Sequence, residues 1–477
     1  MTGTKLLPGQ ASLPTPNSTN SFWHSQPSKI LLGHRTTESL PTEADLVIVG
    51  SGLSGTSAAH FLREDEAGKN LKVVMLEARE ACWGATGRNG GHCQPFIYGN
   101  PPDVGAFEMR NYQHIKTFIA TNNIPCDWRT LRVAHAYMDS AMFQRSLAIF
   151  QSFLKEDPSY SDLVSVITPE SSNPSLADLR IPTAAGAFLQ KHAASVWPYK
   201  LVAWMLERLL DTNENGALNF NLQTNTAVTH LQKSSDGSWI VHTPRGMIAA
   251  KKVLLTTNAY TSHLLPEFSD LIVPVRGEMS SLIPPPTMKP GNDENPPFEI
   301  SYGFIGNGRQ NRHQDDYLIQ RPYSKDNSTG GELMFGGGRS YAAKAGLGVS
   351  DDSSIDEPSA EYLRREITVV VDIKSEEKEL KASYEWSGIM GYSRDDRPWV
   401  GELTEELGLG GGKGLFVCAG FTGHGMPNTC LSGKAAVDLM LGKKSEEVDL
   451  PESYCLSKER LAKARVLDEV HIVDAKG

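Results

Sequence analysis

The sequence predicts an α/β protein in which a parallel sheet is interrupted by a second domain that contains an antiparallel sheet. The first observation is an apolar run at 46–49 that leads directly into a glycine-rich turn, a helix-like stretch and a second apolar run at 71–76. The second is the mixture of helix-like and strand-like segments along the rest of the chain. The third is the length of 477 residues, which suits two domains or one large discontinuous domain.

The glycine-rich turn has the spacing of a dinucleotide-binding loop. Gly50 permits a tight turn, Gly52 lets the backbone approach a pyrophosphate, and Gly55 lets the helix pack on the strand. The free N–H groups at the start of the helix suit the phosphates. Glu77 follows Gly55 by 22 residues, where an acid can accept hydrogen bonds from ribose hydroxyls. A glycine-rich surface turn is the alternative, but the flanking strands, helix and acid favour nucleotide binding. The residues expected to bind the dinucleotide here are Gly50, Gly52, Leu53, Ser54, Gly55, Glu77, Ala78 and Arg79.

A second glycine-rich segment, at 84–91, narrows the cofactor to a flavin. Its glycines disfavour a helix interior, and its Thr, Arg and Asn side chains can bind phosphate, ribose or flavin oxygens. Nicotinamide enzymes with such a first unit do not usually continue from the second strand in this way. The residues of this segment that we expect at the cofactor are Gly84, Ala85, Thr86, Arg88, Asn89, Gly90, Gly91 and His92.

With this segment the chain resembles the D-amino-acid-oxidase-like FAD-dependent oxidoreductases, in particular the branch similar to bacterial gamma-glutamylputrescine oxidase. Three later segments agree with the resemblance, which covers roughly residues 40 to 445: PVRG at 274–277, WSGIMGY at 386–392 followed by DRP at 396–398, and GFTGHGM at 420–426. The resemblance implies a discontinuous, Rossmann-like FAD-binding domain with an inserted α+β substrate domain built on an antiparallel sheet. It also implies cofactor contacts at Val228, Thr257, Asn258, Ala259, Gly391, Gly420, Thr422, Gly423, His424, Gly425 and Met426.

The implied organisation alternates between the two domains. An N-terminal arm (1–40) is followed by the first segment of the FAD-binding domain (41–135) and by a mostly helical segment of the substrate domain (136–195). The chain then returns to the FAD-binding domain (196–270), enters the substrate domain (271–385), completes the FAD-binding domain (386–445) and ends in a C-terminal tail (446–477). The arm is rich in Pro, Ser and Thr, so we expect it on the surface and partly disordered, with Trp23 as one anchoring contact.

The elements follow from periodicity and turn residues. Helices are predicted where apolar residues recur at helical spacing, namely at 105–122, 141–156, 199–210 (directly after Pro198), 358–374 and 432–442. Strands are predicted at 217–220, 227–231, 239–242 and 252–255, with a hairpin turn at Asp236-Gly237, and as antiparallel strands within 301–340. The stretch 284–297 contains so many Pro, Asn and Gly residues that we expect an exposed loop.

The expected chemistry follows from the flavin, which accepts a hydride at its N5 atom. The resemblance implies an amine or amino-acid oxidase that forms an imine, with reoxidation by O2 to H2O2. Two alternatives remain open: a dehydrogenase that passes electrons to a quinone or a protein carrier, and a flavin-fold protein that binds a ligand without turnover. The intact glycine turn, Glu77 and the loop at 423–425 argue against the last.

Two histidines are the catalytic candidates. His424 lies between two glycines on a loop expected at the flavin, where a polar or positive group would stabilise the reduced ring; its alternative role is to shape the loop. His92 stands where the related branch usually carries Gln. It is expected to face the flavin edge, to contact the substrate or to bond covalently to the flavin, or else to be a hydrogen-bonded histidine without a chemical role.

FAD is expected to bind without a covalent bond, because the segment IMGY at 389–392 lacks the cysteine that tethers FAD in sarcosine-oxidase relatives. His92 and Cys93 are the alternative points of attachment. The residues expected to face the substrate are Tyr317, Gln320, Tyr392 and Arg394, with Tyr302 and Phe304 in the same segments. A substrate carboxylate would need an arginine, and the candidates are Arg276, Arg321, Arg339 and Arg394.

Composition argues against several other classes. The net charge is −10 without a basic run, so we expect no nucleic-acid partner. No run of apolar residues is long enough to cross a membrane. The six cysteines form no CxxC pair, so we expect free thiols and no metal site. The start of the sequence lacks the apolar core of a signal peptide, and the cytoplasm is the expected location. The sequence does not predict the oligomeric state.

Overall fold

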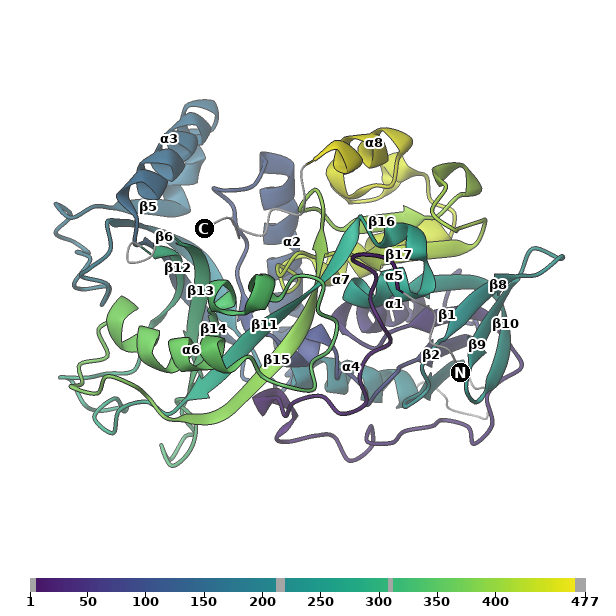
Figure 1. Cartoon of the computed structure of the whole chain (residues 1–477), viewed down its shortest axis with the longest axis horizontal. Helices are drawn as coiled ribbons and strands as arrows, with labels where there is room; N and C mark the ends of the chain where they lie inside the picture. Colours follow the sequence, from purple (N-terminus) through teal and green to yellow (C-terminus); the bar gives the residue numbers. More distant parts are fainter. Residues whose placement is uncertain (1–5, 212–218, 308–311, 468–477) are drawn as a thin grey trace.

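Two β-sheets that lie side by side along the molecule form the framework of the protein (Figure 1). The computed structural model describes residues 6–211, 219–307 and 312–467. The first sheet has the order β16-β17-β10-β1-β2-β7, and its pairs are parallel except at β16. Its strands are β1 (Glu43–Val49), β2 (Val73–Leu76), β7 (Phe220–Gln223), β10 (Gly246–Leu255), β16 (Trp399–Glu402) and β17 (Leu415–Ala419), with the antiparallel strands β8 (His230–Lys233) and β9 (Trp239–Thr243) attached to β10.

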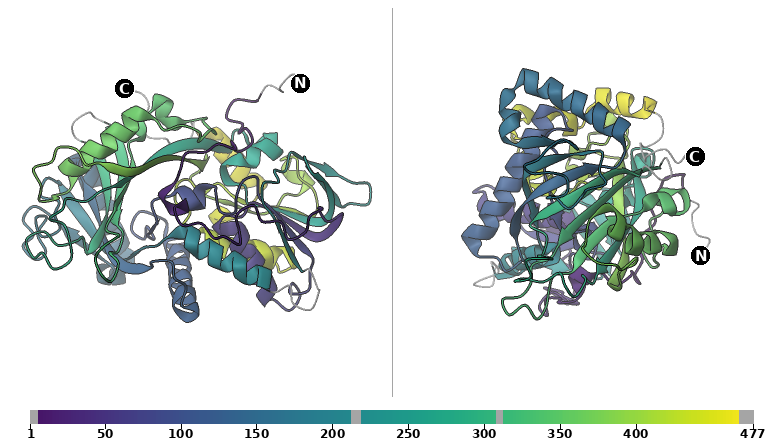
Figure 2. Two further views of the ribbon diagram at one scale, coloured as in Figure 1. Left: turned by 90° about the horizontal axis from the view of Figure 1, so that it is seen from below. Right: turned by 90° about the vertical axis from the view of Figure 1, so that its left-hand side faces the viewer.

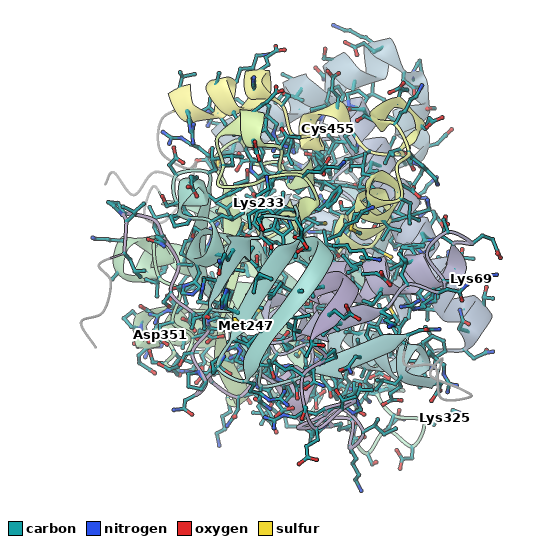
Figure 3. All side chains as sticks on the ribbon, turned by 90° about the vertical axis from the view of Figure 1, so that its right-hand side faces the viewer. Lys69, Lys233, Met247, Lys325, Asp351 and Cys455 are labelled. Atoms are coloured by element: carbon teal, nitrogen blue, oxygen red, sulfur yellow. The ribbon has the colours of Figure 1, made fainter. Side chains whose placement is uncertain are left out.

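Strand β2 is buried on both faces, which is why its sequence is a continuous apolar run rather than an alternating one. Helix α1 (Leu53–Glu64) follows the glycine-rich turn and packs against α4 (Pro198–Asp211) and α7 (Thr429–Met440). Helix α2 (Pro102–Asn122) also contacts α7. Strands β8, β9 and β10 project at the right-hand end of the molecule in Figure 1. Lys233 and Met247 of these strands lie on the surface there (Figure 3).

The second sheet has the order β15-β11-β14-β13-β12-β4-β6-β3, with β5 paired to β6. Its pairs are antiparallel except for β4 and β12, which are parallel because the chain returns to the first sheet between them. Its strands are β3 (His92–Cys93), β4 (Arg129–Tyr137), β5 (Val164–Ile167), β6 (Gly186–Ser195), β11 (Ile272–Leu282), β12 (Ile300–Asn307), β13 (Arg312–Gln320), β14 (Leu333–Gly337) and β15 (Ala382–Ser393). Helix α6 (Glu357–Val370) packs on β11 and β14 (Figure 2). The other α-helices in the described part of the chain are α3 (Ser140–Glu156), α5 (Thr261–Leu264) and α8 (Lys458–Val466).

The five predicted helices are present, with ends that differ by a few residues. Residues 217 and 218 of the strand expected at 217–220 lie outside the described residues, and β7 begins at Phe220. The segment 136–195, expected to be mostly helical, also contains β5 and β6. The strand pairing can be set beside two of the expected domain boundaries. β4 pairs within the second sheet, whereas the FAD-binding segment is expected at 41–135. β15 pairs with β11 as far as Ser393, whereas the return to the FAD-binding domain is expected at 386.

The N-terminal arm is anchored to the core around Trp23, although several of its other described residues are exposed. The Trp23 side chain is buried in the main core, and the Trp197 indole donates to the Trp23 carbonyl oxygen at 2.8 Å. The Ser21 hydroxyl donates to the Gly87 carbonyl oxygen at 2.8 Å, and the Trp23 indole donates to the carbonyl oxygen of Asn89. The arm therefore supports the second glycine-rich segment through hydrogen bonds, a role that its polar composition does not indicate.

Candidate active site

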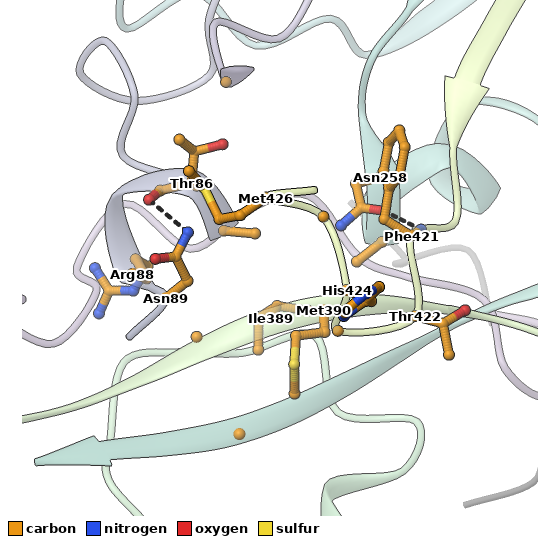
Figure 4. Close-up of a pocket in the computed structure, with 18 of the residues that line it drawn as sticks. Thr86, Arg88, Asn89, Asn258, Ile389, Met390, Phe421, Thr422, His424 and Met426 are labelled. Atoms are coloured by element: carbon orange, nitrogen blue, oxygen red, sulfur yellow. Dashed lines mark hydrogen bonds between the residues drawn. The ribbon is translucent and has the colours of Figure 1, made fainter. Parts of the chain in front are cut away.

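A cavity of about 670 Å³ lies where the two sheets meet, and both contribute to its wall. One end is formed by the glycine-rich turn after β1 and by the segments that follow the carboxyl ends of β2 and β10, the usual ligand position in an open α/β sheet. The other end is formed by β4, β12, β13 and the loop after β17. Figure 4 shows a portion of the wall, where Thr86, Asn89, Asn258 and His424 come together from distant regions of the chain.

The glycine-rich turn has the geometry that the sequence predicts. Gly50 has a φ of +108°, which favours glycine, and a Cβ there would lie 2.9 Å from the Thr256 carbonyl oxygen. A Cβ on Gly55 would lie 2.3 Å from the Gly50 carbonyl oxygen, so the close approach of helix and turn requires glycine. Gly52 caps α1, and its carbonyl oxygen accepts from the amide of Thr56. The amides of Leu53 and Ser54 have no intrahelical acceptor, and both residues line the wall; the Leu53 amide donates to the Thr86 hydroxyl, and the Ser54 amide suits a phosphate.

Glu77 is fixed at the cavity wall by three hydrogen bonds. Its Oε2 atom accepts from the amide and the hydroxyl of Ser51 at 3.1 and 2.6 Å. Its Oε1 atom accepts from the amide of Arg79 at 3.0 Å. A carboxylate has about four acceptor sites, so Oε1 can still accept from a ribose hydroxyl. The position and the remaining capacity of Glu77 fit the role predicted for it.

The second glycine-rich segment covers the start of α1. The Thr86 hydroxyl accepts from the Leu53 amide at 3.1 Å, and the Asn89 side-chain amide donates to the Thr86 carbonyl oxygen at 3.1 Å (Figure 4). A Cβ on Gly84 would meet no atom within 4 Å, because this glycine faces open space in the cavity. The segment therefore places backbone and small side chains, rather than bulky groups, at the nucleotide end.

Two arginines expected at the cofactor reach the wall, but their guanidinium groups bind other groups of the protein. Asp352 is fully buried, and its carboxylate lies 2.9 Å from Arg79 and 3.3 Å from Arg88. Arg88 Nε also donates to the Ser387 carbonyl oxygen at 2.7 Å, and another of its nitrogens donates to the Thr19 carbonyl oxygen at 2.6 Å. Burial lowers the pKa of Arg88 to about 10, so it remains charged at neutral pH. These residues organise the loop around the nucleotide end.

The loops after β10 and β17 meet through one side chain. The Oδ1 atom of Asn258 accepts from the amides of Gly420 and Phe421 at 3.0 and 3.3 Å (Figure 4). A Cβ on Gly391 would lie 2.6 Å from the same Oδ1 atom, so this glycine allows β15 to approach the two loops. Asn258 therefore joins the loop after β10, strand β15 and the loop after β17. Each of these three segments resembles a different flavin-binding segment of the family.

Most residues predicted at the cofactor line the cavity. Four glycines do not, and lie behind its wall: Gly55, Gly91, Gly391 and Gly420. Their direct contact with the cofactor stays a prediction, and the structure gives each of them a packing reason for being glycine, because each lies where a Cβ would meet a neighbouring group. Gly91, for example, has a φ of +68°, and a Cβ there would lie 2.5 Å from the Val196 carbonyl oxygen.

The substrate candidates divide evenly. Tyr317 and Tyr392 line the cavity, whereas Gln320 and Arg394 do not. Gln320 is fully buried on β13, where it accepts from the Phe298 amide and donates to the Gly331 carbonyl oxygen. Arg394 lies beyond the end of β15 and donates to the Leu467 carbonyl oxygen at 2.8 Å. Tyr302 and Phe304 belong to a separate core.

Of the four candidate arginines, Arg339 is the one that lines the cavity among the described residues. Its Cζ atom lies 5.0 Å from the centre of the Tyr392 ring, which also lines the cavity. Arg276 and Arg321 do not line the cavity; Arg276 pairs with Glu278 and Asp356, and Arg321 pairs with Asp127 and Glu332. Because of its place at the wall, Arg339 is the candidate that lies near a ligand in this cavity.

The far end of the cavity contains residues that the sequence did not identify. They come from the loop after β3, from β4, from α3 and from β12: Gln94, Phe96, His135, Tyr137, Met142, Ser146, Gly303 and Ile305. One signal was available for two of them, because His135 and Tyr137 are two residues apart in a strand and so share a face. We call this end of the cavity, together with His92 and His424, the histidine chamber.

Two histidines of this chamber are neutral. Burial is the main cause that lowers the pKa of His92 to about 3, and likewise the pKa of His135 to about 3. Nε2 of His92 is 2.9 Å from the Ser301 hydroxyl, and Nε2 of His135 is 2.9 Å from Oε1 of Gln94. Within the described regions of the chain, Nδ1 of each ring has no hydrogen-bond partner, which leaves two buried nitrogens for a ligand to satisfy.

His424 has the opposite character. Its Nε2 atom lies 3.1 Å from Oε2 of Glu108 on α2, a carboxylate that no motif identified. Burial by itself lowers the pKa of His424, but the charge of Glu108 and the hydrogen bond to it outweigh that effect, and the net pKa is raised. The His424 side chain is 34% exposed and lines the cavity. The chamber therefore combines two neutral imidazoles with one that favours the charged form.

Comparisons with known proteins agree with this geometry. A sequence model of the family described as FAD dependent oxidoreductase (DAO) matches residues 45–439. The chain is 24% identical over 423 residues to a probable oxidoreductase OrdL from Rhizobium meliloti, covering 86% of this chain and 85% of the relative. It is 23% identical over 438 residues to the gamma-glutamylputrescine oxidoreductase of Escherichia coli, covering 89% of each. The glycine oxidase structure from Geobacillus kaustophilus superposes with a TM-score of 0.64 at 19% identity, covering 85% of this chain and 96% of that one.

The fold and the cavity define an FAD-binding protein, and the chain belongs to the FAD-dependent oxidoreductase family. The site fits the cofactor, because Ser54 at the start of α1, Glu77 and the glycines Gly50, Gly52 and Gly84 line the same cavity. No group of His, Cys, Asp or Glu that could hold a metal ion occurs among residues 6–211, 219–307 and 312–467. In the same residues, no helix is both long and apolar enough to cross a membrane.

Proposed function

We propose that this chain oxidises the C–N bond of an amine or amino acid to an imine, with O2 as electron acceptor. The net reaction, R₂CH–NHR′ + O₂ → R₂C=NR′ + H₂O₂, balances in atoms and electrons. The observation that carries the proposal is the single cavity that joins the nucleotide turn to the histidine chamber. When bound, FAD supplies the acceptor for the substrate hydride. The names of the relatives, gamma-glutamylputrescine oxidoreductase and glycine oxidase, support a C–N bond as the target.

The neutral histidines suit an amine. An amine must lose its ammonium proton before its lone pair can assist the loss of a hydride. A nearby positive charge, such as that of His424, favours the uncharged form of the amine. The unpartnered Nδ1 atoms of His92 and His135 can accept hydrogen bonds from the N–H groups of such an amine. A pKa near 3 makes both rings weak bases, so we assign them binding and orientation of the amine rather than removal of its proton.

The role of Arg339 depends on whether the substrate is an amine or an amino acid. An amino-acid substrate carries a carboxylate, which a guanidinium binds through two parallel hydrogen bonds. Arg339 lies at the cavity wall against Tyr392. We assign it the carboxylate if the substrate is an amino acid, and a purely structural role if it is a simple amine.

The test mixes the purified FAD-containing protein, without O2, with a panel of primary amines, secondary amines and amino acids. Loss of the visible FAD absorbance identifies a substrate, and H2O2 formed after O2 is admitted identifies an oxidase. FAD that is reduced by a substrate but yields no H2O2, and is reoxidised by a quinone, would favour the dehydrogenase. A protein whose FAD is reduced by dithionite but by no compound of the panel would contradict the proposal.

We also propose that FAD is held without a covalent bond. The segment at 389–392 contains no cysteine, Cys93 is fully buried, and Nε2 of His92 is engaged with Ser301. Acid precipitation should leave the flavin in the supernatant, whereas flavin in the pellet would show a covalent bond. A cytoplasmic location is likewise our proposal, which the free state of all six cysteines supports.

A further inference from the structure

Glu108 is a buried carboxylate surrounded by hydrogen-bond donors. Its side chain is 1% exposed, on the face of α2 that packs under the loop after β17. Oε2 accepts from the Phe96 amide at 2.7 Å and is 3.1 Å from Nε2 of His424. Oε1 accepts from the side-chain amides of Asn100 and Asn428 at 3.1 and 3.0 Å. A carboxylate that receives four donors is stabilised in its ionised form.

The hydrogen bonds of Glu108 also fix the direction of the His424 ring. Because Nε2 points at Glu108, Nδ1 lies on the other side of the ring, and no described residue bonds to it. The main chain is held from both sides, since the His424 amide donates to the Phe421 carbonyl oxygen and its carbonyl oxygen accepts from Asn428. Tyr454 in turn donates to Asn428 at 2.7 Å. The ring therefore has one defined orientation relative to the cavity.

We infer that Glu108 is a positioning residue, which holds His424 as an imidazolium with its Nδ1–H turned toward the cavity where FAD binds. The inference deepens the proposed function and rests on it for its catalytic meaning. A fixed positive charge close to a flavin stabilises the negative charge that arrives with the electrons. Glu108 would thus set the electron affinity of the cofactor through His424 without touching FAD or the substrate.

The charges around the pair support this assignment. Burial works against protonation of His424, and Arg397 also lowers its pKa. Glu108 is the group that raises it, and in return His424 lowers the pKa of Glu108 against the opposing effect of burial. The titratable and charged groups facing the pair from the surrounding elements are His92, Cys93, His135, Arg397 and Tyr454. Since His92 and His135 stay neutral, Glu108 is the anion that balances His424.

The experiment measures the pKa of His424 directly in the FAD-containing protein labelled with ¹³C-histidine, with H424Q used to assign its signal. We expect a value above 6.5 in the wild type, and a fall of about one to three pH units in Glu108→Gln, because an adjacent opposite charge shifts a pKa by that amount. Glu108→Asp, which keeps the charge, should recover some of the shift. Asn100→Ala is the matched control, because it removes one hydrogen bond to Glu108 and leaves the charge in place.

A redox measurement tests the consequence. In equilibrium with a redox dye, a smaller fraction of FAD should be reduced in E108Q than in the wild type at a pH between the two His424 pKa values. In an H424Q background, E108Q should have no further effect on this fraction. Neither readout requires an amine, so failure of the proposed amine oxidation would leave both intact.

Two outcomes of the pKa measurement would overturn the inference. One is an E108Q protein that binds FAD and keeps the wild-type pKa of His424. The other is a wild-type pKa below 6.5, a result that does not depend on whether any Glu108 variant folds. An equal loss of reduced FAD in E108Q with and without His424 would place Glu108 outside the proposed path and would also overturn it.

Discussion

Replacing Glu77 by alanine should weaken FAD binding about ten- to hundredfold. The carboxylate lies on the cavity wall, and Oε1 keeps one acceptor site beyond the bond from the Arg79 amide. A hydrogen bond to a charged group contributes about 1.5–3 kcal/mol, and each 1.4 kcal/mol changes a dissociation constant about tenfold. A single lost ribose contact of this kind accounts for the whole expected range.

The same substitution should also destabilise the protein without FAD. The Ser51 and Arg79 amides and the Ser51 hydroxyl donate to Glu77, and alanine leaves these groups without that acceptor. Each buried unsatisfied donor costs about 1–3 kcal/mol unless water replaces the acceptor. Glu77→Gln keeps one carbonyl oxygen and should lie between the wild type and alanine in both affinity and stability.

The assay is a fluorescence titration of FAD into the apo-protein, with urea unfolding of the same samples. Asp45→Ala is the matched control. Asp45 is a carboxylate near the start of β1, where it pairs with Lys251, whereas Glu77 follows the carboxyl end of the neighbouring strand β2. An unchanged FAD dissociation constant in a folded Glu77→Ala protein would refute the ribose contact. A similar loss of affinity in Asp45→Ala would show that general destabilisation, not the contact, is responsible.

The nucleotide end of the site could be predicted because its rules are local. The positions of Gly50, Gly52 and Gly55 are dictated by one turn, and Glu77 follows at a distance set by one helix and one strand. The family resemblance added the loops at 257–259 and 420–426, which the structure brings to the same cavity. That four predicted glycines lie behind the wall could not be deduced, because spacing does not distinguish a close approach to a ligand from a close approach to another backbone.

The substrate end could not be predicted because it depends on which strands pair. His135 enters the chamber through the pairing of β4 with β6 and β12, whose partners are distant in sequence. One error was avoidable: Tyr317 and Gln320 are three residues apart in one strand, so their side chains point to opposite faces and cannot both meet the cavity. Arg394 is a different case, since β15 ends at Ser393 and the side chain leaves the sheet.

Buried carboxylates whose partners are distant in the sequence could not be predicted, for the same reason. Glu108 and His424 are 316 residues apart, and Asp352 reaches Arg79 across 273 residues. A glutamate on an amphipathic helix is expected to point into solvent. The packing of α2 against the loop before α7 shows instead that Glu108 faces the counter-charge of His424. The sequence thus identifies the cofactor and proposes His424 as the residue that tunes it, while the carboxylate paired with His424 emerges from tertiary contacts.

Three further predictions follow from particular side chains. Trp23→Ala should cost about 3–5 kcal/mol of unfolding free energy, the usual loss for a buried tryptophan. The variant should also lose FAD faster in gel filtration, and unchanged FAD retention would show that the arm does not support the site. Arg339→Ala should raise the KM of an amino-acid substrate at least about tenfold while Arg394→Ala does not; equal effects would remove Arg339 from its assigned role. The last concerns pH: His92 and His135 are neutral when folded, with pKa values of about 3, but titrate near 6.5 when unfolded. The stability that comes from keeping them neutral is fully present above pH 6.5, and as the pH falls toward 3 the unfolded chain takes up protons that the folded protein refuses. Each ring should therefore remove up to about 1.4 kcal/mol of unfolding free energy per pH unit, and His92→Gln with His135→Gln should flatten urea-unfolding stability between pH 6 and 4; a slope as steep as that of the wild type would mean that these imidazoles are not the buried neutral groups of the chamber.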